Sequence, residues 1–345
     1  MWLPAKRASP IPGEPNYLFV NSSKLIPLAG QAEWEEELEG IPHVFGHTWG
    51  GCHALSLDGR GAAQLFVADG EGGKVACPLI EREIDGRLDV ATPYGFSGLT
   101  GTGPWPGFPV GWREFASTRG YVAGYLAVNA LFGDDSYADP ETVTVANETF
   151  VLDLREGVEG VWSGLSTNRR RQLRDWRAED YEVDGEGAAE FFVEQYPPTM
   201  ERKEAAARHR FPAETLAALC ELPNTFLVAA RVEGRLESIS IFGFTPYAGD
   251  FLFNAALPGC AHHSVALIWS AVHLLVERGV PWFNLGGGMS PGDSLADFKA
   301  RFGAAPLPMR AVKAVYDQAA YEELCHRHGG DPDDRDGYFP AYRNA

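Results

Sequence analysis

The chain has 345 residues, of which 45% are hydrophobic and 22% are charged, which is enough apolar material for two domains of roughly 100 to 200 residues each. This composition excludes a disordered or fibrous protein. The 29 basic and 47 acidic side chains give a net charge of −18, which opposes non-specific adhesion to nucleic acid or to an anionic membrane. A polyanionic partner must therefore be met by local basic patches.

Three further features concern the location of the protein and its cysteines. The longest apolar stretch, Val265 to Val276, is interrupted by Ser270 and His273 and is shorter than the ~20 residues that a membrane span requires. The proline-rich N-terminus, residues 1–15, lacks the apolar core of a secretory signal, so a cytoplasmic protein is expected. Five scattered cysteines without a CxxC pair indicate reduced thiols and no metal site.

The first half of the chain contains short apolar runs separated by turn signals. Between Pro42 and Thr92 the runs HALSL, AAQLFVA, KVACPLI and RLDVA alternate with DGRG, DGEGG and DGR, a spacing that predicts antiparallel strands and hairpins. A loop rich in glycine, proline and aromatic residues follows, and it is too long to be a simple connection. Helix-like and strand-like segments then alternate over residues 112–131.

A second domain is expected to begin with a strand at residues 147–154. Helices are predicted from near Val158 through STNRRRQLRDWRAED and over residues 188–196, 200–208 and 213–222. Three strands joined by turns follow in NTFLVAARVEG, RLESISIFGFTP and GDFLFNAALP, and a helix over 264–278 leads to a strand over 282–285. This order predicts an α+β fold with a mixed sheet.

Four stretches together carry a family resemblance: TPYGFSGL (92–99), STNRRRQLRDW (166–176), PTMERK (198–203) and FNLGGGMSPGDSLADFKARFG (283–303). In this order and spacing the chain resembles the Fem-like tandem acyltransferases, which include peptidoglycan-bridge aminoacyltransferases and related enzymes that form amide bonds on small natural products. The resemblance implies two GNAT-like mixed-sheet domains in tandem, expected at residues 1–148 and 149–320. The polar tail at 321–345 is expected on the surface, either partly disordered or packed on the first domain.

The resemblance also implies an activity. In such proteins an acceptor amine and an activated acyl donor meet in or beside the cleft between the two domains. Amide formation requires a neutral amine, a group that receives its proton, and donors aimed at the oxyanion that develops on the carbonyl. Because no Ser-His-Asp or Cys-His arrangement is visible in the sequence, direct attack by the amine is expected.

The most specific stretch contains the expected catalytic residue, Lys299. Similar enzymes place the lysine of an FK motif at the donor end of the cleft, where the cation stabilises the oxyanion or holds a phosphate of the donor. An exposed helix lysine is the alternative interpretation. Gly286, Gly287 and Gly288 follow a predicted strand, and they either let the backbone approach a ligand or form a tight turn into the next helix.

Four more side chains are candidates for contact with the acceptor. Tyr94 offers a phenol from the glycine-rich loop, and Arg202 resembles a family position near the acceptor. Asn254 is polar within an apolar strand, so its amide either faces a ligand or is satisfied within the sheet. Phe298 is the last candidate, although its spacing from Phe302 places both on one helix face and also fits a core role.

A cluster of basic residues reverses the overall charge locally. Five arginines and one aspartate lie between residues 169 and 177. We expect Arg169, Arg170 and Arg174 to bind phosphates of tRNA, of a nucleotide-linked acceptor or of CoA. The alternative is a solvated helix face paired with the acidic surface.

The choice of donor depends on two opposing observations. Acyl-CoA enzymes of the GNAT fold cradle pyrophosphate with a Q/R-x-x-G-x-G/A loop at a helix N-terminus, and the corresponding sequence here, LPGCAHHSVAL, has one glycine. This departure favours aminoacyl-tRNA, whereas the acidity of the chain opposes tRNA binding. We therefore expect aminoacyl-tRNA as co-substrate, an amine of a small molecule or peptide as acceptor, and no bound cofactor. An acyl-CoA-dependent N-acyltransferase and a catalytically silent binding protein are the alternatives.

Overall fold

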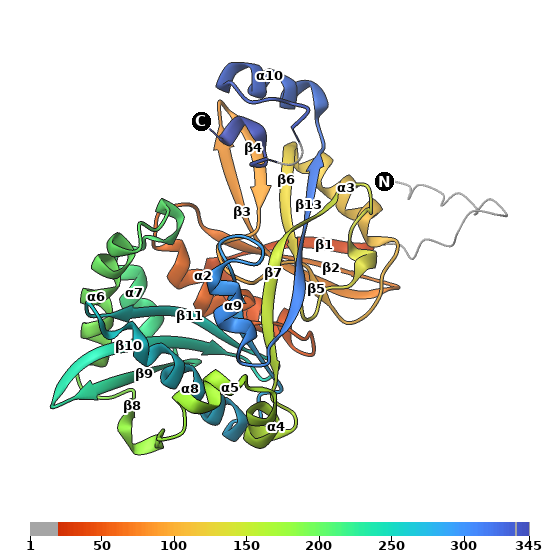
Figure 1. The fold of residues 1–345 in the computed structure, drawn as a ribbon. Coiled ribbons are helices and arrows are strands. Elements are labelled where there is room, and N and C mark those ends of the chain that lie inside the picture. The colour runs from red at the N-terminus through yellow and green to blue at the C-terminus, as the bar shows by residue number, and fades with distance from the viewer. Residues whose placement is uncertain (1–19, 335–336, 345) are drawn as a thin grey trace.

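The computed structural model describes residues 20–334 and 337–344, so the proline-rich segment at residues 1–15 lies outside the described residues. The thirteen described strands form one mixed sheet in the order β1-β2-β3-β4-β6-β13-β7-β12-β11-β10-β9-β8, with β5 paired to β3 (Figure 1). These strands are β1 (Val20–Pro27), β2 (Ala63–Gly70), β3 (Gly73–Ile84), β4 (Arg87–Ala91), β5 (Thr100–Gly101), β6 (Tyr121–Val128), β7 (Val143–Asp153), β8 (Tyr181–Val183), β9 (Thr225–Val232), β10 (Arg235–Phe244), β11 (Gly249–Ala256), β12 (Trp282–Gly287) and β13 (Ala305–Val315).

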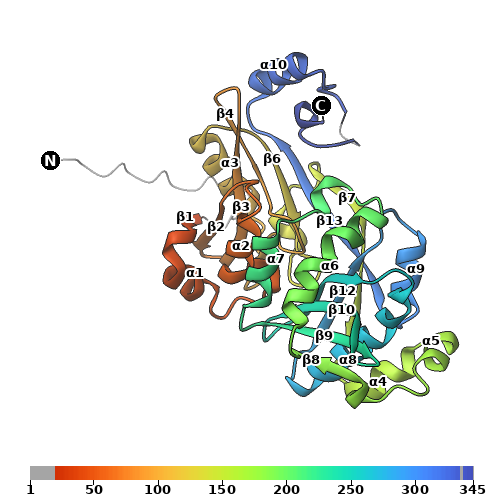
Figure 2. The same cartoon turned by 90° about the vertical axis from the view of Figure 1, so that its left-hand side faces the viewer.

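Helices cover both halves of this sheet. Helix α3 packs on the first half, while α6 and α7 cover one face of the second half and α4 and α8 cover the other (Figures 1 and 2). The described α-helices are α1 (Gln31–Leu38), α2 (Trp49–Ser56), α3 (Phe108–Arg119), α4 (Gly157–Gly164), α5 (Thr167–Gln172), α6 (Ala188–Arg202), α7 (Ala213–Cys220), α8 (Ser264–Glu277), α9 (Ser294–Ala300) and α10 (Gln318–His328).

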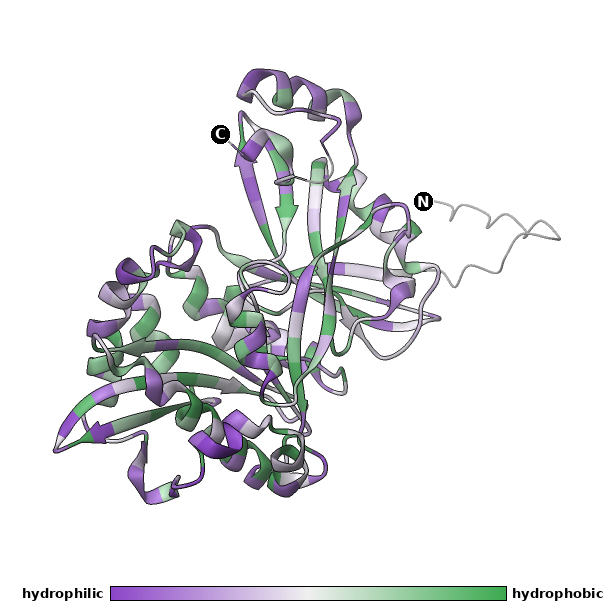
Figure 3. Ribbon diagram, in the orientation of Figure 1, coloured by the Kyte–Doolittle hydropathy of each residue, from purple (hydrophilic) through white to green (hydrophobic). Residues whose placement is uncertain are grey.

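The strands of the second half are apolar almost without interruption because both of their faces are buried. In β9, Phe226 and Val228 point into the core under α8, whereas Leu227 and Ala229 point into the core under α6 and α7. Two-sided burial of this kind produces a continuous hydrophobic run instead of an alternating one. Figure 3 shows the result, with hydrophobic residues along these strands and hydrophilic ones at the tip of the β9–β10 hairpin.

The two long strands at the centre of the sheet, β7 and β13, lie where the two halves meet, and each pairs with a strand that is not its neighbour in the sequence. Strand β7 follows β6 in the sequence but pairs with β12, and β13 follows β12 but pairs with β6. The two strands also pair with each other over most of their length, so they run side by side through the middle of the molecule (Figure 1). The expected division after residue 148 falls within β7.

Each half contains one pair of parallel strands, β4 with β6 and β11 with β12. In the first half, the backbone at Leu99 pairs with the end of β6 after β4 has ended. Leu99 N–H donates to Ala127 O at 2.8 Å, and Asn129 N–H donates to Leu99 O at 3.0 Å. In the second half, β11 and β12 pair only at Gly249–Phe283 and Asp250–Asn284. Beyond these two positions they separate.

The α+β architecture predicted from the sequence is confirmed, but three local predictions are wrong. No separate helix covers residues 200–208, because α6 continues to Arg202 and only a 3-10 turn, Ala207–His209, follows. The run HALSL belongs to helix α2 and not to a strand, because Thr48 caps the helix by accepting from Gly51 N–H at 3.2 Å. The basic stretch after Val158 is not one helix. It divides into α4 and α5, and Ser166 caps the second helix through Arg169 N–H.

The C-terminal segment packs on the first half. Tyr321 and Leu324 of α10, together with Tyr342, are buried against Val122 and Ala123 of β6. Where it is described, the tail is therefore ordered and contributes to a core of its own, so of the two expectations for this segment the structure supports packing on the first half and not partial disorder. Figures 1 and 2 place α10 and the C-terminus next to the outer end of the β3–β4 hairpin.

Candidate active site

Lys299 lies on α9 and is largely buried, with 6% of its surface exposed. Its Nζ donates a hydrogen bond of 2.5 Å to the carbonyl oxygen of Gly287 at the end of β12. Burial lowers the pKa of this ammonium group to about 8, against the opposing influence of the Asp293 carboxylate. The lysine is therefore a desolvated cation held against the end of a strand, and not an exposed helix lysine.

The glycines after β12 permit this close approach. Gly286 has a φ of +78°, and a Cβ atom there would lie 3.1 Å from Lys299 Nζ and 3.0 Å from Cζ of Phe96. A Cβ atom at Gly287 would lie 2.5 Å from Glu148 O, which is closer than real Cβ contacts. A side chain at either position would displace its neighbours. Because Phe96 belongs to the first half, the lysine stands at the boundary between the halves.

A chain of buried polar groups fixes the base of the opening between β11 and β12. Asp250 Oδ2 accepts from Phe45 N–H at 3.1 Å, and Asp250 Oδ1 accepts from Asn284 Nδ2 at 3.0 Å. The amide oxygen of Asn284 in turn accepts from Thr149 Oγ1 at 2.5 Å and from Gly286 N–H at 2.9 Å. Burial raises the pKa of Asp250 to about 6 despite these hydrogen bonds. The chain connects the first half to the glycine beside Lys299.

A cleft lies between the two halves, on the face of β6, β13 and β7 that is turned toward the second half. Its lining includes side chains from the loop after β4, from β6 and the residues that follow it, and from β7, β12 and β13. Two of the lining residues, Phe96 and Asn284, also contact or bond Gly286. Lys299 is not part of the lining, but its Nζ approaches Gly286, the residue that these two side chains also contact.

The structure places Tyr94 in an aromatic cluster that joins the two halves. Its hydroxyl group lies 2.9 Å from His209 Nδ1, and its ring contacts the rings of Phe211 and Phe253. Burial raises the pKa of the phenol to about 12. The side chain is engaged within the protein and does not line the cleft described above.

Arg202 and Asn254 are also engaged within the protein. Arg202 donates to the hydroxyl oxygen of Thr199 at 2.9 Å and to the carbonyl oxygen of Ala256. The amide nitrogen of Asn254 donates to the hydroxyl group of Ser240 at 3.1 Å and to a carbonyl group of β10. Of the two interpretations of Asn254, the structure supports the one in which the amide is satisfied within the sheet.

The arginine cluster separates into buried and exposed members. Arg169 is 4% exposed, and its guanidinium lies 4.3 Å and 4.7 Å from the ring centres of Phe298 and Phe302. It also donates to Phe298 O at 2.9 Å, and burial lowers its pKa to about 10. Arg169 thus joins α5 to α9, and Phe298 packs in the same contact. Arg170 and Arg174 are exposed to solvent.

A pair of parallel strands in each half, two long central strands paired with each other and a candidate site at the boundary between the halves define a tandem fold of the GNAT type. The structure is similar to the crystal structure of FemX, with a TM-score of 0.63 and 11% sequence identity over 88% of this chain and 99% of that one. It is also similar to a conserved protein of unknown function from Bacteroides thetaiotaomicron, with a TM-score of 0.55 and 10% identity over 86% of this chain and 100% of that one. The chain therefore has the Fem-like tandem GNAT fold that the four sequence stretches predicted.

Comparison by sequence adds no relative, since no family model and no curated protein matches the chain. Within residues 20–334 and 337–344, no group of three or more His, Cys, Asp or Glu side chains is arranged to hold a metal ion. No helix of the described part of the chain is long and apolar enough to cross a membrane.

Sequence reasoning missed four residues around the cleft: Ser97, Asp250, Asn284 and Arg310. Ser97 and Asn284 lie inside the stretches TPYGFSGL and FNLGGG, so the resemblance contained a signal for them. Asp250 is an acidic residue at the start of an apolar strand, which is a second usable signal because buried carboxylates require partners. Arg310 carries no such signal, because only the pairing of β13 with β6 and β7 brings it to the cleft.

Proposed function

We propose that this protein is an acyltransferase that moves an amino acid from aminoacyl-tRNA to an amine of a small molecule or peptide, forming an amide bond by direct attack. The observation that carries this proposal is the position of Lys299, a desolvated cation at the boundary between the halves, beside the separated ends of β11 and β12. A fixed positive charge in a site of low dielectric constant stabilises a developing oxyanion far better than the same charge in water.

Lys299 has hydrogen-bonding capacity to spare for this role. An ammonium group has three N–H donors, and within the described residues one of them is used, by Gly287 O. The remaining two donate to the oxyanion that forms when the amine nitrogen attacks the ester carbonyl carbon. When this intermediate collapses, the carbon–oxygen bond to the ribose breaks. The proton lost by the amine ends on the ribose oxygen, so ester and amine become amide and free hydroxyl.

Exposed arginines of α5 and of the turn after it supply a contact surface for a polyanionic donor. Helix α5 is bound to α9, because Ser166 N–H donates to Arg301 O at 3.0 Å and Arg169 donates to Phe298 O at 2.9 Å. Arg170 of α5 and Arg174 of the turn after it therefore belong to a segment that is bound to the helix carrying Lys299. Phosphates held there by counterion release place the end of the donor near the lysine.

An acyl-CoA donor is the second candidate, and one observation favours it. The turn Cys260–His263 and helix α8 follow β11 beside the opening between β11 and β12, and neither has a side-chain cap at its first residue. Uncapped N–H groups at a helix start bind pyrophosphate. The single glycine of this segment still argues against a full pyrophosphate loop.

The test uses the purified protein, a pool of charged tRNA and an extract of small molecules, with mass spectrometry of the products. Transfer from aminoacyl-tRNA predicts an N-aminoacyl product that disappears when the charged tRNA is first treated with RNase. Product formation that survives RNase contradicts the proposal. Transfer from acyl-CoA instead predicts release of free CoA thiol, and no response to RNase.

A further inference from the structure

Two polar atoms in the lining of the cleft have no hydrogen-bond partner. They are Oγ of Ser97, a residue that is 3% exposed, and Nε of Arg310, and both atoms are buried. Buried polar atoms are almost always hydrogen-bonded, because an unpaired one is removed from water and gains nothing in return. Two such atoms in one cleft indicate a ligand that accepts hydrogen bonds from both.

Arg310 lies beside a β-bulge in the cleft wall. Met309 pairs with Asn147 of β7 and Arg310 pairs with Val145, so Ala146 of β7 is the extra residue. Ala146, Met309 and Arg310 all line the cleft. Bulges of this kind are common next to binding sites. One end of the guanidinium forms an ion pair with the exposed carboxylate of Asp135, and Nε remains without a partner.

Contacts to the backbone of residues 96 and 97 fix the position of Ser97, so its hydroxyl group is unpaired within a well-packed loop. The amide nitrogen of Asn129 donates to Phe96 O at 2.8 Å and to Ser97 O at 3.4 Å. Gly46 packs tightly on the other side, since a Cβ atom there would lie 3.1 Å from Ser97 N. The hydroxyl group is therefore fixed in the cleft wall without a partner of its own.

We propose that this cleft binds an oxyanion, a carboxylate or a phosphate, through the guanidinium of Arg310 and the hydroxyl group of Ser97. Arginine suits such groups because its planar set of N–H donors matches their oxygen atoms. Phe96 and Asn284 line this cleft and also contact Gly286, the residue that Lys299 approaches, so this cleft and the lysine share a wall. Calling this ligand the acceptor, an amine that also carries an anionic group, rests on the proposed function. The oxyanion site itself does not.

Binding is tested without any acyl donor, by saturation-transfer NMR on the full chain with three separate probes. Inorganic phosphate and L-alanine represent the two sources of an oxyanion, and L-alaninamide carries the same amine as L-alanine without the carboxylate. We expect one of the two anions to bind at least about tenfold more tightly than L-alaninamide, the factor that loss of a charge-assisted hydrogen bond produces. If neither anion binds more tightly than L-alaninamide, the inference is overturned.

Variants locate the site. Arg310→Gln is expected to abolish anion binding and Ser97→Ala to weaken it several-fold, whereas Asp135→Asn, which removes the competing carboxylate, retains it or tightens it. Arg113→Gln removes an exposed arginine of α3 outside this cleft and serves as the matched control. If Arg310→Gln does not fold, the test is anion binding by Ser97→Ala. Binding by this variant that equals binding by the wild type overturns the inference. A protein that binds the anion but transfers no amino acid contradicts the proposed function alone.

Discussion

Asp250 and Asn284 face each other across β11 and β12, and a hydrogen bond of 3.0 Å joins their side chains at the last position where the two strands are paired. Asp250 also accepts from the backbone of Phe45 in the first half, and Asn284 accepts from the backbone of Gly286. The pair therefore links the first half to the glycine that contacts Lys299. The shape of the proposed reaction centre depends on a contact that lies wholly inside the protein.

The pH dependence of stability is expected to depend on Asp250. Its pKa is raised from 3.8 to about 6 in the folded protein, so its protonated form is stabilised by folding. This contribution is full below pH 4 and is lost as the pH rises through 6, a change on the order of 3 kcal/mol. Asp250→Asn removes it. Urea unfolding at pH 4 and pH 7 should show a larger loss of stability for the wild type than for the variant, and parallel profiles would contradict this assignment.

Lys299→Ala is expected to lower kcat by about 100-fold to 1000-fold, the usual effect of removing one oxyanion donor. The pKa of the lysine is lowered to about 8, so activity that needs the cation should decline as the pH rises above 8. Lys299→Arg keeps the charge at high pH, and its residual activity should lack this decline. The measurement is a pH profile of kcat for both variants and the wild type, and a decline in all three would assign it to another group.

Replacing Arg170 and Arg174 together with glutamine is expected to weaken binding of charged tRNA without changing the unfolding temperature, because both side chains are exposed. The slope of log Kd against log salt concentration should fall by about one to two, because each arginine that no longer neutralises a phosphate releases one counterion fewer. Arg113→Gln, in the first half, is the control and should change neither quantity. A salt slope unaffected by the double variant would move the tRNA surface elsewhere.

Two aspartates hold the C-terminal segment, and their removal should have very different consequences. Asp89 is fully buried and accepts from Arg82 at 2.7 Å, from Arg343 at 2.5 Å and from the hydroxyl group of Tyr342 at 3.0 Å. Asp89→Ala leaves two arginines without their partner and should cost about 3 to 5 kcal/mol of folding free energy.

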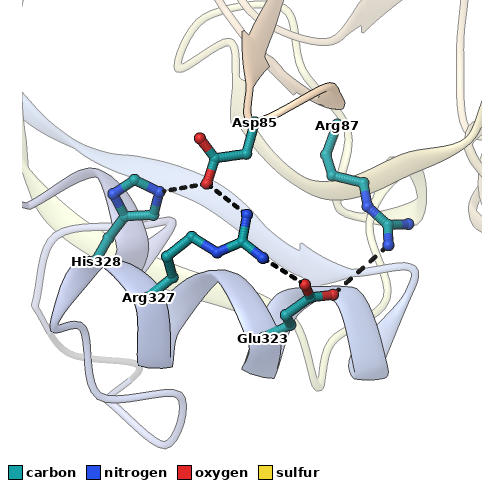
Figure 4. Close-up of polar contacts among 5 residues, drawn as sticks. All are labelled: Asp85, Arg87, Glu323, Arg327 and His328. Carbon is teal, nitrogen blue, oxygen red and sulfur yellow. Dashed lines mark hydrogen bonds and ion pairs between the residues drawn. The ribbon is translucent and has the colours of Figure 1, made fainter.

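Asp85 is the control for this prediction, because it also connects the first half to the C-terminal helix. It accepts from Arg327 and from His328, each at 3.0 Å, at the turn between β3 and β4 (Figure 4). These partners are partly open to solvent, so salt and water screen the contact. Asp85→Ala should therefore destabilise the protein far less than Asp89→Ala in urea unfolding, and equal effects would contradict the role given to burial.

The sequence predicted the repeated order of strands and helices well because hydrophobic runs and turn signals report local structure. The helix at HALSL was missed because a short apolar run fits a strand and a helix equally, and the deciding contact is the cap at Thr48. Composition also does not predict which of two neighbouring arginines is buried. Arg169 points into the core and Arg170 into solvent, although the sequence presents them as one basic cluster.

Among the site residues, the glycines and Lys299 were accessible from the sequence because the motif joins them within a short span. Ser97 and Arg310 come from segments more than 200 residues apart, and only the folded sheet brings them to one cleft. The bulge at Ala146, opposite Met309 and Arg310, is a property of strand pairing. No local pattern in the sequence predicts it.

The pairing of β7 and β13 has a consequence for how this protein can be divided. A fragment ending before β7 would leave β6 without β13. A fragment starting at β7 would keep the strands of the second half, but β13 would have an open row of backbone donors and acceptors where it pairs with β6. Cutting the polypeptide between the halves should therefore yield two pieces with unpaired strand edges that promote aggregation, and mixing the pieces should restore the pairing of β6 with β13. Engineering that swaps one half for that of a relative must carry the reciprocal strand along with it.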